Sequence, residues 1–387
     1  MLNVTGRLLD PNLIGDRAQA LKSHLKSTVI GQDEAIDCVV RSMAPYAAGM
    51  CAPGRPIASM LFLGSTGVGK TYCVEQLASH ILGSDRGITR ISCESFYDRH
   101  EVAKLIGSPN GYIGSDEPAM LQQSEINKWR AGDGQNSDLN KPMLSVILFD
   151  EIDKAHPALH RLLLGILDSG RINLAKGRVT DFSKSIIIMT ANWGSGEIAR
   201  LHDGGFGFVQ EKVGDDGVHN AAMGAAKKSL SPEFWNRIDS TVVFGNLGEN
   251  DIKMVCECEL GKLQKRMREC ETPFLFTVNS EVKNALIKEG YSAKYGAREL
   301  KRTIERRLAQ PFANMVSSGQ IHAGEILKVY YIRGEYVFRV KEGRPIPWLV
   351  NPNFPFDKKP TAPEFQVKPP ADPMDPAPKL WPYNNQP

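Results

Sequence analysis

The chain has 387 residues, of which 42% are hydrophobic and 24% are charged, and its formal net charge is +3 with His neutral. This length allows about two or three domains with a substantial buried core, and this composition is ordinary for a soluble globular protein. A net charge this close to zero gives no electrostatic reason to expect a nucleic acid or a membrane surface as a partner.

The cysteine pattern argues against a zinc site. The seven cysteines are scattered, and the one close pair, Cys256 and Cys258, has no second pair to complete a ligand set. Reduced thiols are therefore expected. The N-terminus shows no basic region followed by an apolar run, and no apolar stretch is long enough to span a bilayer. We expect a cytoplasmic protein.

The first two thirds of the sequence predict an α/β fold. Residues 1–27 predict a short helical lead-in. From residue 28 to 247, apolar strand-like runs alternate with helical patterns, which indicates a large subdomain with a parallel sheet covered by helices. The clearest strands are Ser59–Leu63, Ser145–Phe149 and Ser185–Met189. The first and last alternate little, as strands buried on both faces do.

From residue 248 to 342 the pattern changes to that of a smaller α+β subdomain. Its expected elements are helix Asp251–Cys270, strand Phe274–Val278, helix Ser280–Glu289, basic helix Ala297–Ser317, and strands Ile326–Ile332 and Tyr336–Val340. Residues 343–387 differ again, because 13 of the 24 prolines lie between Arg344 and Pro387. This tail is expected to be extended or disordered, and it either docks a partner such as an adaptor or trails in solvent.

A glycine-rich loop from Gly64 to Thr71 follows a predicted strand and opens a predicted helix, which is the pattern of a phosphate-binding loop. Glycines let the backbone wrap closely around phosphates, so that N–H groups and the helix N-terminus face the anion. Lys70 is expected to neutralise the β- and γ-phosphates of ATP, and the Thr71 hydroxyl to bind Mg²⁺. The expected nucleotide contacts in this loop are Ser65, Thr66, Gly67, Val68, Gly69, Lys70 and Thr71.

Two carboxylates follow the buried strand Ser145–Phe149. The end of this strand would place Asp150 at the carboxyl edge of the sheet, beside the phosphate loop, where it can hold Mg²⁺. Glu151 is then placed to polarise the attacking water as a general base. Acidic pairs after strands are also common as helix caps. This pair indicates a hydrolysis site because a phosphate loop precedes it in the same predicted sheet.

Three further polar side chains each have two interpretations. Asn192 follows the strand Ser185–Met189, where it can orient water near a γ-phosphate or simply belong to a turn. Arg237 precedes the apolar strand Thr241–Phe244, and an ordinary surface ion pair would also account for it. Arg298 lies at the start of the basic helix, which is a poor place for a cation unless an anion is nearby.

Taken together, these motifs closely resemble the second ATPase module of the Clp unfoldases and disaggregases, within the AAA+ superfamily. The resemblance runs from about Ser27 to Val340, and it implies a P-loop AAA+ module in single-module form. A loop around Trp129–Asn140 looks longer than the usual connection in the family. The most specific pieces are the phosphate loop, Leu148–Pro157, Asp168–Phe182, Pro232–Phe244 and Gly296–Arg302.

The resemblance implies roles for individual residues. Asn192 becomes the sensor of the γ-phosphate, and Arg298 the second sensor, which links nucleotide state to movement of the small subdomain. Arg237 becomes an arginine finger that acts on ATP held by the neighbouring subunit, a contribution of about 10³–10⁵ in rate in other P-loop enzymes. Val29 and Ile30, with Gly31 and Gln32, match the segment that packs on the adenine. A finger acting in trans implies a closed homo-oligomeric ring, with six subunits as the family's number.

Two segments are candidates for contact with a substrate. Tyr112 and Ile113 are flanked by glycines in a turn-rich loop, which suits either a mobile loop that grips apolar groups or an aromatic folded back on its own domain. The resemblance identifies this loop with the axial pore loop that grips translocating polypeptide. It also identifies Asp168–Phe182 with a second pore hairpin. The charges of this hairpin line the channel or form a solvated face: Arg171, Lys176 and Arg178.

The expected function is therefore an ATP-driven ring that unfolds, remodels or translocates proteins through a central pore. The family's disaggregases also carry an N-terminal substrate domain, a first ATPase ring and a coiled-coil middle domain, so disaggregation is not expected here. One alternative is a peptidase-coupled unfoldase, because Phe206–Phe208 lies where such relatives carry an aliphatic-Gly-Phe docking loop. The other is a nucleotide-dependent ring that docks a partner without threading. A DNA-directed motor is disfavoured by the near-neutral charge.

Overall fold

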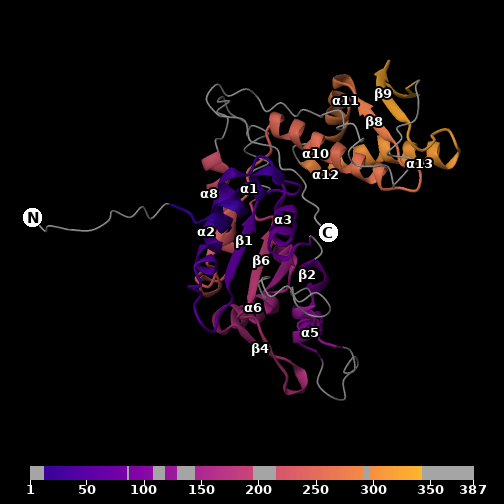
Figure 1. Cartoon of the computed structure of the whole chain (residues 1–387). Coiled ribbons are helices and arrows are strands. Elements are labelled where there is room, and N and C mark those ends of the chain that lie inside the picture. The colour runs from indigo at the N-terminus through magenta and orange to yellow at the C-terminus, as the bar shows by residue number, and fades with distance from the viewer. Residues whose placement is uncertain are drawn as a thin grey trace, which may run out of the picture.

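The computed structural model describes residues 13–84, 87–107, 118–128, 144–194, 215–291 and 296–341. Its main feature is a five-stranded sheet with the strand order β2-β3-β6-β1-β7 (Figure 1). Every neighbouring pair of strands is parallel, so the α/β fold class and the parallel sheet are confirmed. The strands are β1 Ala58–Leu63, β2 Ile88–Ser92, β3 Ser145–Asp150, β6 Ser185–Ala191 and β7 Ser240–Val243.

Both faces of this sheet carry a buried apolar layer. Along β1, Leu61 and Leu63 enter one apolar cluster, whereas Met60 and Phe62 enter the other, which explains why this strand is apolar at successive positions. The helices on the second face are α1 Asp16–Thr28, α2 Asp33–Ala47 and α3 Lys70–Leu82. Those on the first are α4 Arg99–Ile106, α5 Gln123–Asn127, α6 Pro157–Ser169, α8 Asp215–Ser229 and α9 Pro232–Trp235.

An antiparallel hairpin projects from the end of α6. It pairs β4 Arg171–Asn173 with β5 Val179–Asp181, and a short 3₁₀ turn, η3 Ala175–Gly177, lies at its tip. In Figure 1 it points away from the small subdomain, at the opposite end of the molecule. Arg171, Lys176 and Arg178 are all exposed on it. The segment Asp168–Phe182 therefore forms the hairpin that the sequence predicts.

The small subdomain has its own sheet and core. Its three strands follow the order β10-β9-β8, with β8 parallel and β10 antiparallel to β9. Phe312 lies at the centre of its apolar cluster, with ring centroids 5.0 Å from Phe276 and 5.7 Å from Phe274. Its elements are α10 Glu249–Arg268, β8 Leu275–Val278, α11 Ser280–Gly290, α12 Ala297–Ile304, α13 Gln310–Ser317, β9 Ile326–Ile332 and β10 Glu335–Val340.

Some elements differ from the sequence-based prediction. The edge strand β2 was not predicted, because it is short and only one of its five residues is buried. The predicted basic helix Ala297–Ser317 contains one π-helical turn, Glu305–Ala309, between α12 and α13. The predicted lead-in becomes helix α1, whose Leu21 and Leu25 are buried in the apolar cluster with α2 and α3. The lead-in therefore contributes to the core of the large subdomain.

Several predicted features lie outside the residues that the structure describes. They are residues 1–12, Tyr112 and Ile113, the Trp129–Asn140 loop, Phe206–Phe208 and the tail from residue 343. Among the helices of the described ranges, none is long and apolar enough to cross a membrane. All seven cysteines lie in these ranges and are free thiols.

Candidate functional site

A glycine-rich loop joins β1 to α3 at the carboxyl edge of the five-stranded sheet. Gly64, directly after β1, has a φ of 140°, and a Cβ at this position would lie 2.7 Å from the Phe244 carbonyl oxygen. Glycine is therefore required where the loop leaves the sheet. The loop ends at Gly69, and α3 begins with Lys70 and Thr71. A loop of this kind presents backbone N–H groups and a helix N-terminus to an anion.

Lys70 is the buried cation of the site, with only 8% of its surface exposed. Its Nζ donates hydrogen bonds to the Gly64 carbonyl oxygen at 2.6 Å, the Ser65 carbonyl oxygen at 2.8 Å and Asn192 Oδ1 at 2.8 Å. Burial lowers the pKa of Lys70 to about 8, while the nearby carboxylates Asp153 and Asp150 oppose this shift. The ammonium is thus held at the end of the sheet by oxygen atoms that phosphate oxygens can replace.

Asp150 ends β3 next to the loop. Its Oδ1 accepts a hydrogen bond from the Thr190 hydroxyl at 2.5 Å and lies 3.4 Å from the Thr71 hydroxyl. Its Oδ2 forms an ion pair with Arg90 of β2. A carboxylate beside a hydroxyl, next to a phosphate loop, fits the oxygen ligands that Mg²⁺ prefers. The described ranges hold no group of three or more His, Cys, Asp or Glu that would bind a metal without the nucleotide, and Mg²⁺ often relies on phosphate oxygens in this way.

Glu151 is held in an uncommon backbone conformation directly after β3. Its φ of 60° and ψ of 52° lie in the left-handed region, which a non-glycine residue adopts only when its surroundings fix it. Its N–H donates to the Thr190 hydroxyl at 2.9 Å, and its carboxylate pairs with Lys154 at 2.7 Å. On the neighbouring strand, the Asn192 N–H donates to Asp153 Oδ1 at 3.2 Å. The ends of β3 and β6 are therefore tied together beside Lys70.

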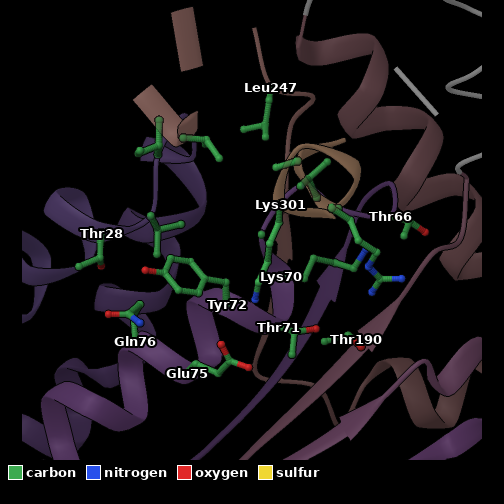
Figure 2. A pocket seen from close by; sticks show the side chains of 18 of the residues that line it. Thr28, Thr66, Lys70, Thr71, Tyr72, Glu75, Gln76, Thr190, Leu247 and Lys301 are labelled. Carbon is green, nitrogen blue, oxygen red and sulfur yellow. The ribbon is translucent and has the colours of Figure 1, made fainter. Parts of the chain in front are cut away.

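The small subdomain supplies the other wall of the site. Gly296, with a φ of 55°, lies so close to the loop that a Cβ would be 2.8 Å from the Gly67 carbonyl oxygen. The Ala297 N–H donates to that same oxygen at 3.1 Å, so α12 begins on the phosphate loop. Between the two subdomains lies a cavity of about 660 Å³. Figure 2 shows Lys301 and Leu247 on one side of it and Lys70, Thr71 and Tyr72 below.

Most of the predicted nucleotide contacts line this cavity. The residues concerned are Val29, Ile30, Thr66, Gly67, Val68, Gly69, Lys70, Thr71, Asp150, Glu151, Asn192 and Arg298. Ser65 does not line it and contributes instead the carbonyl oxygen that holds Lys70. Arg298 is the second residue of α12 and reaches the cavity from the helix start, where an anion would stabilise it.

Gln32 stabilises the phosphate loop without lining the cavity itself. It is buried, and its Nε2 donates to the Val68 carbonyl oxygen at 3.2 Å and to the Gly245 carbonyl oxygen at 2.9 Å. Its Oε1 accepts from the Gly245 N–H at 3.0 Å. One amide side chain therefore joins the loop to the segment after β7. The sequence motif had placed Gln32 in the adenine segment and did not indicate this role.

Other residues of the site were also missed from the sequence. Lys262 of α10 lies 4.3 Å from the centre of the Tyr72 ring of α3, and both line the cavity, so they connect the two subdomains across it. Thr190 joins Asp150 to the Glu151 backbone. Its position two residues before Asn192 at a strand end was the only sequence signal for it. The contact between Arg90 and Asp150 could not be predicted, because the strand β2 that carries Arg90 was itself not predicted.

Arg237 is the predicted site residue that the structure places elsewhere. It does not line the cavity. Its carbonyl oxygen accepts a hydrogen bond from the Ser59 hydroxyl at 3.1 Å, and Ser59 is the second residue of β1. Arg237 therefore lies at the amino edge of the parallel sheet, opposite the phosphate loop. Its guanidinium pairs with Asp168 at 2.7 Å.

Comparison with known proteins assigns both parts of the chain. Residues 55–241 match the family described as AAA domain (Cdc48 subfamily), and residues 247–329 match the C-terminal, D2-small domain of ClpB protein. The chain belongs to the Clp family of AAA+ ATPases. The resemblance read from the sequence is thereby confirmed.

Individual Clp relatives are similar over most of this chain. The chaperone protein ClpB of Pseudomonas putida is 36% identical over 86% of the chain, and the negative regulator of genetic competence ClpC/MecB of Bacillus subtilis is 34% identical over 84%. The chain spans a little over a third of the length of these two relatives, 36% and 38%. Among solved structures, a closed state of Hsp104 with ATPγS and casein aligns with a TM-score of 0.68, 30% identity, and coverage of 84% of this chain and 52% of that one.

The contacts of Gln32 generate a testable prediction for this Clp-family site. We expect Gln32→Glu, which keeps the shape but loses both hydrogen-bond donors, to weaken ATP binding about tenfold or more, because the Val68 and Gly245 carbonyl oxygens lose their partner. Titration with a fluorescent ATP analogue measures this affinity. Gln76→Glu places the same charge on the cavity wall and controls for repulsion of the nucleotide. Equal losses in the two variants would show that charge, and not the support of the loop, causes the effect.

Proposed function

We propose that this chain is an ATP-hydrolysing motor subunit that forms a homo-oligomeric ring and unfolds, remodels or translocates protein substrates through a central pore. One observation carries the proposal. Lys70, Asp150 and Glu151 converge at the carboxyl edge of the sheet, whereas the arginine expected to complete hydrolysis, Arg237, lies at the amino edge. A subunit built in this way needs a neighbour to supply the arginine.

The proposed hydrolysis assigns a separate task to each side chain. The loop N–H groups and Lys70 hold the phosphates of ATP, and Val29 and Ile30 pack on the adenine. The Glu151 carboxylate accepts the proton of the water that attacks the γ-phosphorus, and the bond to the β-phosphate oxygen breaks to leave ADP and phosphate. Asn192, which already holds Lys70, orients the water and contacts the γ-phosphate.

Thr71 and Asp150 are the proposed ligands of Mg²⁺. The carboxylate and hydroxyl oxygens would hold the ion, and Arg90 is the present ion-pair partner of the Asp150 carboxylate. When bound with ATP, the ion neutralises charge that develops on the phosphate oxygens. Arg298 is proposed to contact the nucleotide from α12, so that the position of the small subdomain depends on which phosphates are present.

The proposed ring and its substrate follow from the family and from the pore segments. Hsp104, in the structure that aligns with this chain, is described with ATPγS and with casein, which is a protein. We propose that Tyr112 and Ile113 grip polypeptide in the pore of a ring of six subunits, and that the exposed β4–β5 hairpin lies along the same path. Nucleic acid and membrane have no role in this proposal.

Further proposals concern the parts around the motor. We place the subdomain boundary at residues 247/248, within one residue of Leu247, where the apolar cluster of the small subdomain begins. We propose a cytoplasmic location, in keeping with the free thiols. The tail from residue 343 is proposed to dock an adaptor. A peptidase contact through Phe206–Phe208 remains a second candidate, because ClpA homologues similar to this chain are described as ATP-binding subunits of a Clp protease.

A mixing experiment tests whether Arg237 serves the neighbouring subunit. Glu151→Gln and Arg237→Ala should each lower the rate of ATP hydrolysis at least about a hundredfold. Mixed in equal amounts, they should recover up to about a quarter of the wild-type rate, since about one interface in four then joins an intact Glu151 to an intact Arg237.

The control for this experiment is Lys70→Met, which damages the same site as Glu151→Gln. A mixture of Lys70→Met with Glu151→Gln should stay inactive, because no subunit in it keeps a complete loop and base. If the mixture of Arg237→Ala with Glu151→Gln also stays inactive although mixed rings form, Arg237 does not act in trans.

Threading is tested separately from hydrolysis with Tyr112→Ala. We expect this variant to hydrolyse ATP at close to the normal rate but to lose the unfolding of a tagged fluorescent protein, because the grip on the polypeptide is removed. Loss of fluorescence measures unfolding. If Tyr112→Ala unfolds the substrate as fast as the wild type, this loop does not grip it, and a partner-docking ring becomes the better description.

A further inference from the structure

Asp168 occupies a position that its own helix disfavours. It is the penultimate residue of α6, and the last turn of this helix contains no basic residue. The carboxyl end of a helix carries partial negative charge, so an anion there is destabilising unless cations from elsewhere compensate it. Two arginines do so. Arg237 lies 2.7 Å and Arg55 3.6 Å from the same oxygen, Asp168 Oδ1.

The same carboxylate is joined to the base of the β4–β5 hairpin. Two residues after Asp168, Gly170 turns the chain into β4 with a φ of 60°. A Cβ at Gly170 would lie 2.9 Å from the Gly54 carbonyl oxygen and 3.3 Å from Arg55 Cα. The hairpin base is therefore packed directly on the segment that carries Arg55. On the other strand, the Phe182 N–H closes the base with a 2.7 Å hydrogen bond to the Gly170 carbonyl oxygen.

These contacts make one continuous unit from the hairpin to Arg237. The hairpin base is closely packed, because Phe182 is fully buried and an added Cβ at Gly170 would lie too close to the Gly54 carbonyl oxygen. The Arg237 side chain, in contrast, is one third exposed, and within the described ranges its guanidinium pairs with the Asp168 carboxylate alone. A displacement of the exposed hairpin that moves Gly170 therefore also moves Asp168, and with it the carboxylate that pairs with this guanidinium.

We propose that Asp168 is a positioning residue that aims Arg237 at the neighbouring subunit and transmits displacement of the β4–β5 hairpin to it. This inference rests on the proposed trans role of Arg237. Its consequence is that polypeptide pressing on the hairpin of one subunit changes the rate at which the next subunit hydrolyses ATP. Asp168 itself does not line the nucleotide cavity.

Mixed rings show whether Asp168 acts in the subunit that supplies the arginine or in the subunit that holds the ATP. In rings mixed from Glu151→Gln and Arg237→Ala subunits, ATP is hydrolysed only in the site of an Arg237→Ala subunit. The arginine for that site comes from a neighbouring Glu151→Gln subunit. Adding Asp168→Asn to the Glu151→Gln subunit should lower the recovered rate about fivefold or more, a typical size for coupling between sites. Adding it to the Arg237→Ala subunit should leave the recovered rate unchanged. A general structural role would lower the rate in both arrangements and would overturn the proposal.

A second measurement tests the link to the hairpin. In unmixed rings, unfolded casein should increase the ATPase rate of the wild type, and Asp168→Asn should reduce this increase to close to none. Asp168→Glu, which keeps the carboxylate, should restore part of it. Glu233→Gln removes the same charge from the exposed surface of α9 and should behave as the wild type. Undiminished stimulation by casein in Asp168→Asn would contradict the link.

The outcomes separate this inference from the proposed function. If no mixture recovers activity, the trans role of Arg237 fails and the inference fails with it. If the mixture recovers activity and Asp168→Asn in the arginine-supplying subunit has no effect, the trans role stands and only the role of Asp168 is wrong.

Discussion

The arrangement of the site depends on one buried ammonium group. Lys70 is almost fully enclosed, yet it is held by two carbonyl oxygens of its own loop and by Asn192 from the neighbouring strand. A buried cation is costly unless it is paired or fully hydrogen-bonded, so the loop, β1 and β6 must keep a fixed relation to one another. Gln32 holds the loop from behind, and Thr190 fixes the adjacent acidic turn. Phosphate groups entering the cavity meet a cation that is already in position.

The parallel sheet places the nucleotide-binding residues and the arginine at opposite edges. All five strands run in the same direction, so the side chains after the strands gather at one edge, and those before the strands at the other. Asp150 and Asn192 are at the first edge, whereas Arg237 and Asp168 are near the second. A side chain is too short to reach from one edge of the sheet to the other in any rotamer. One subunit therefore cannot bring residues from both edges to the same nucleotide. Under the proposed trans role of Arg237, assembly follows from this topology, and the hairpin that follows Asp168 lies at the same edge as the arginine.

Much of this was predictable because strong local signals coincided. The phosphate loop and the acidic pair combine glycine spacing with buried strands, and the sheet places both at the same edge. Contacts that depend on tertiary packing gave no such signal. Arg90 was missed with its edge strand, and Lys262 reaches Tyr72 from a different subdomain. Gln32 bonds to Gly245, which is 213 residues away in the chain. Asp168 was included in a matched segment, but its pairing with Arg237 depends on how α6 and α9 pack and is not encoded in either helix alone.

The central claim is that the nucleotide site of one subunit is complete only beside another. The most direct measurement is ATP turnover per subunit over a wide range of protein concentration, with the mass of the particles determined in parallel by analytical ultracentrifugation. Turnover per subunit should be near zero where the chain is monomeric and should rise in proportion to the fraction of the chain in rings. A monomer that hydrolyses ATP at the same rate per subunit as the ring would contradict it.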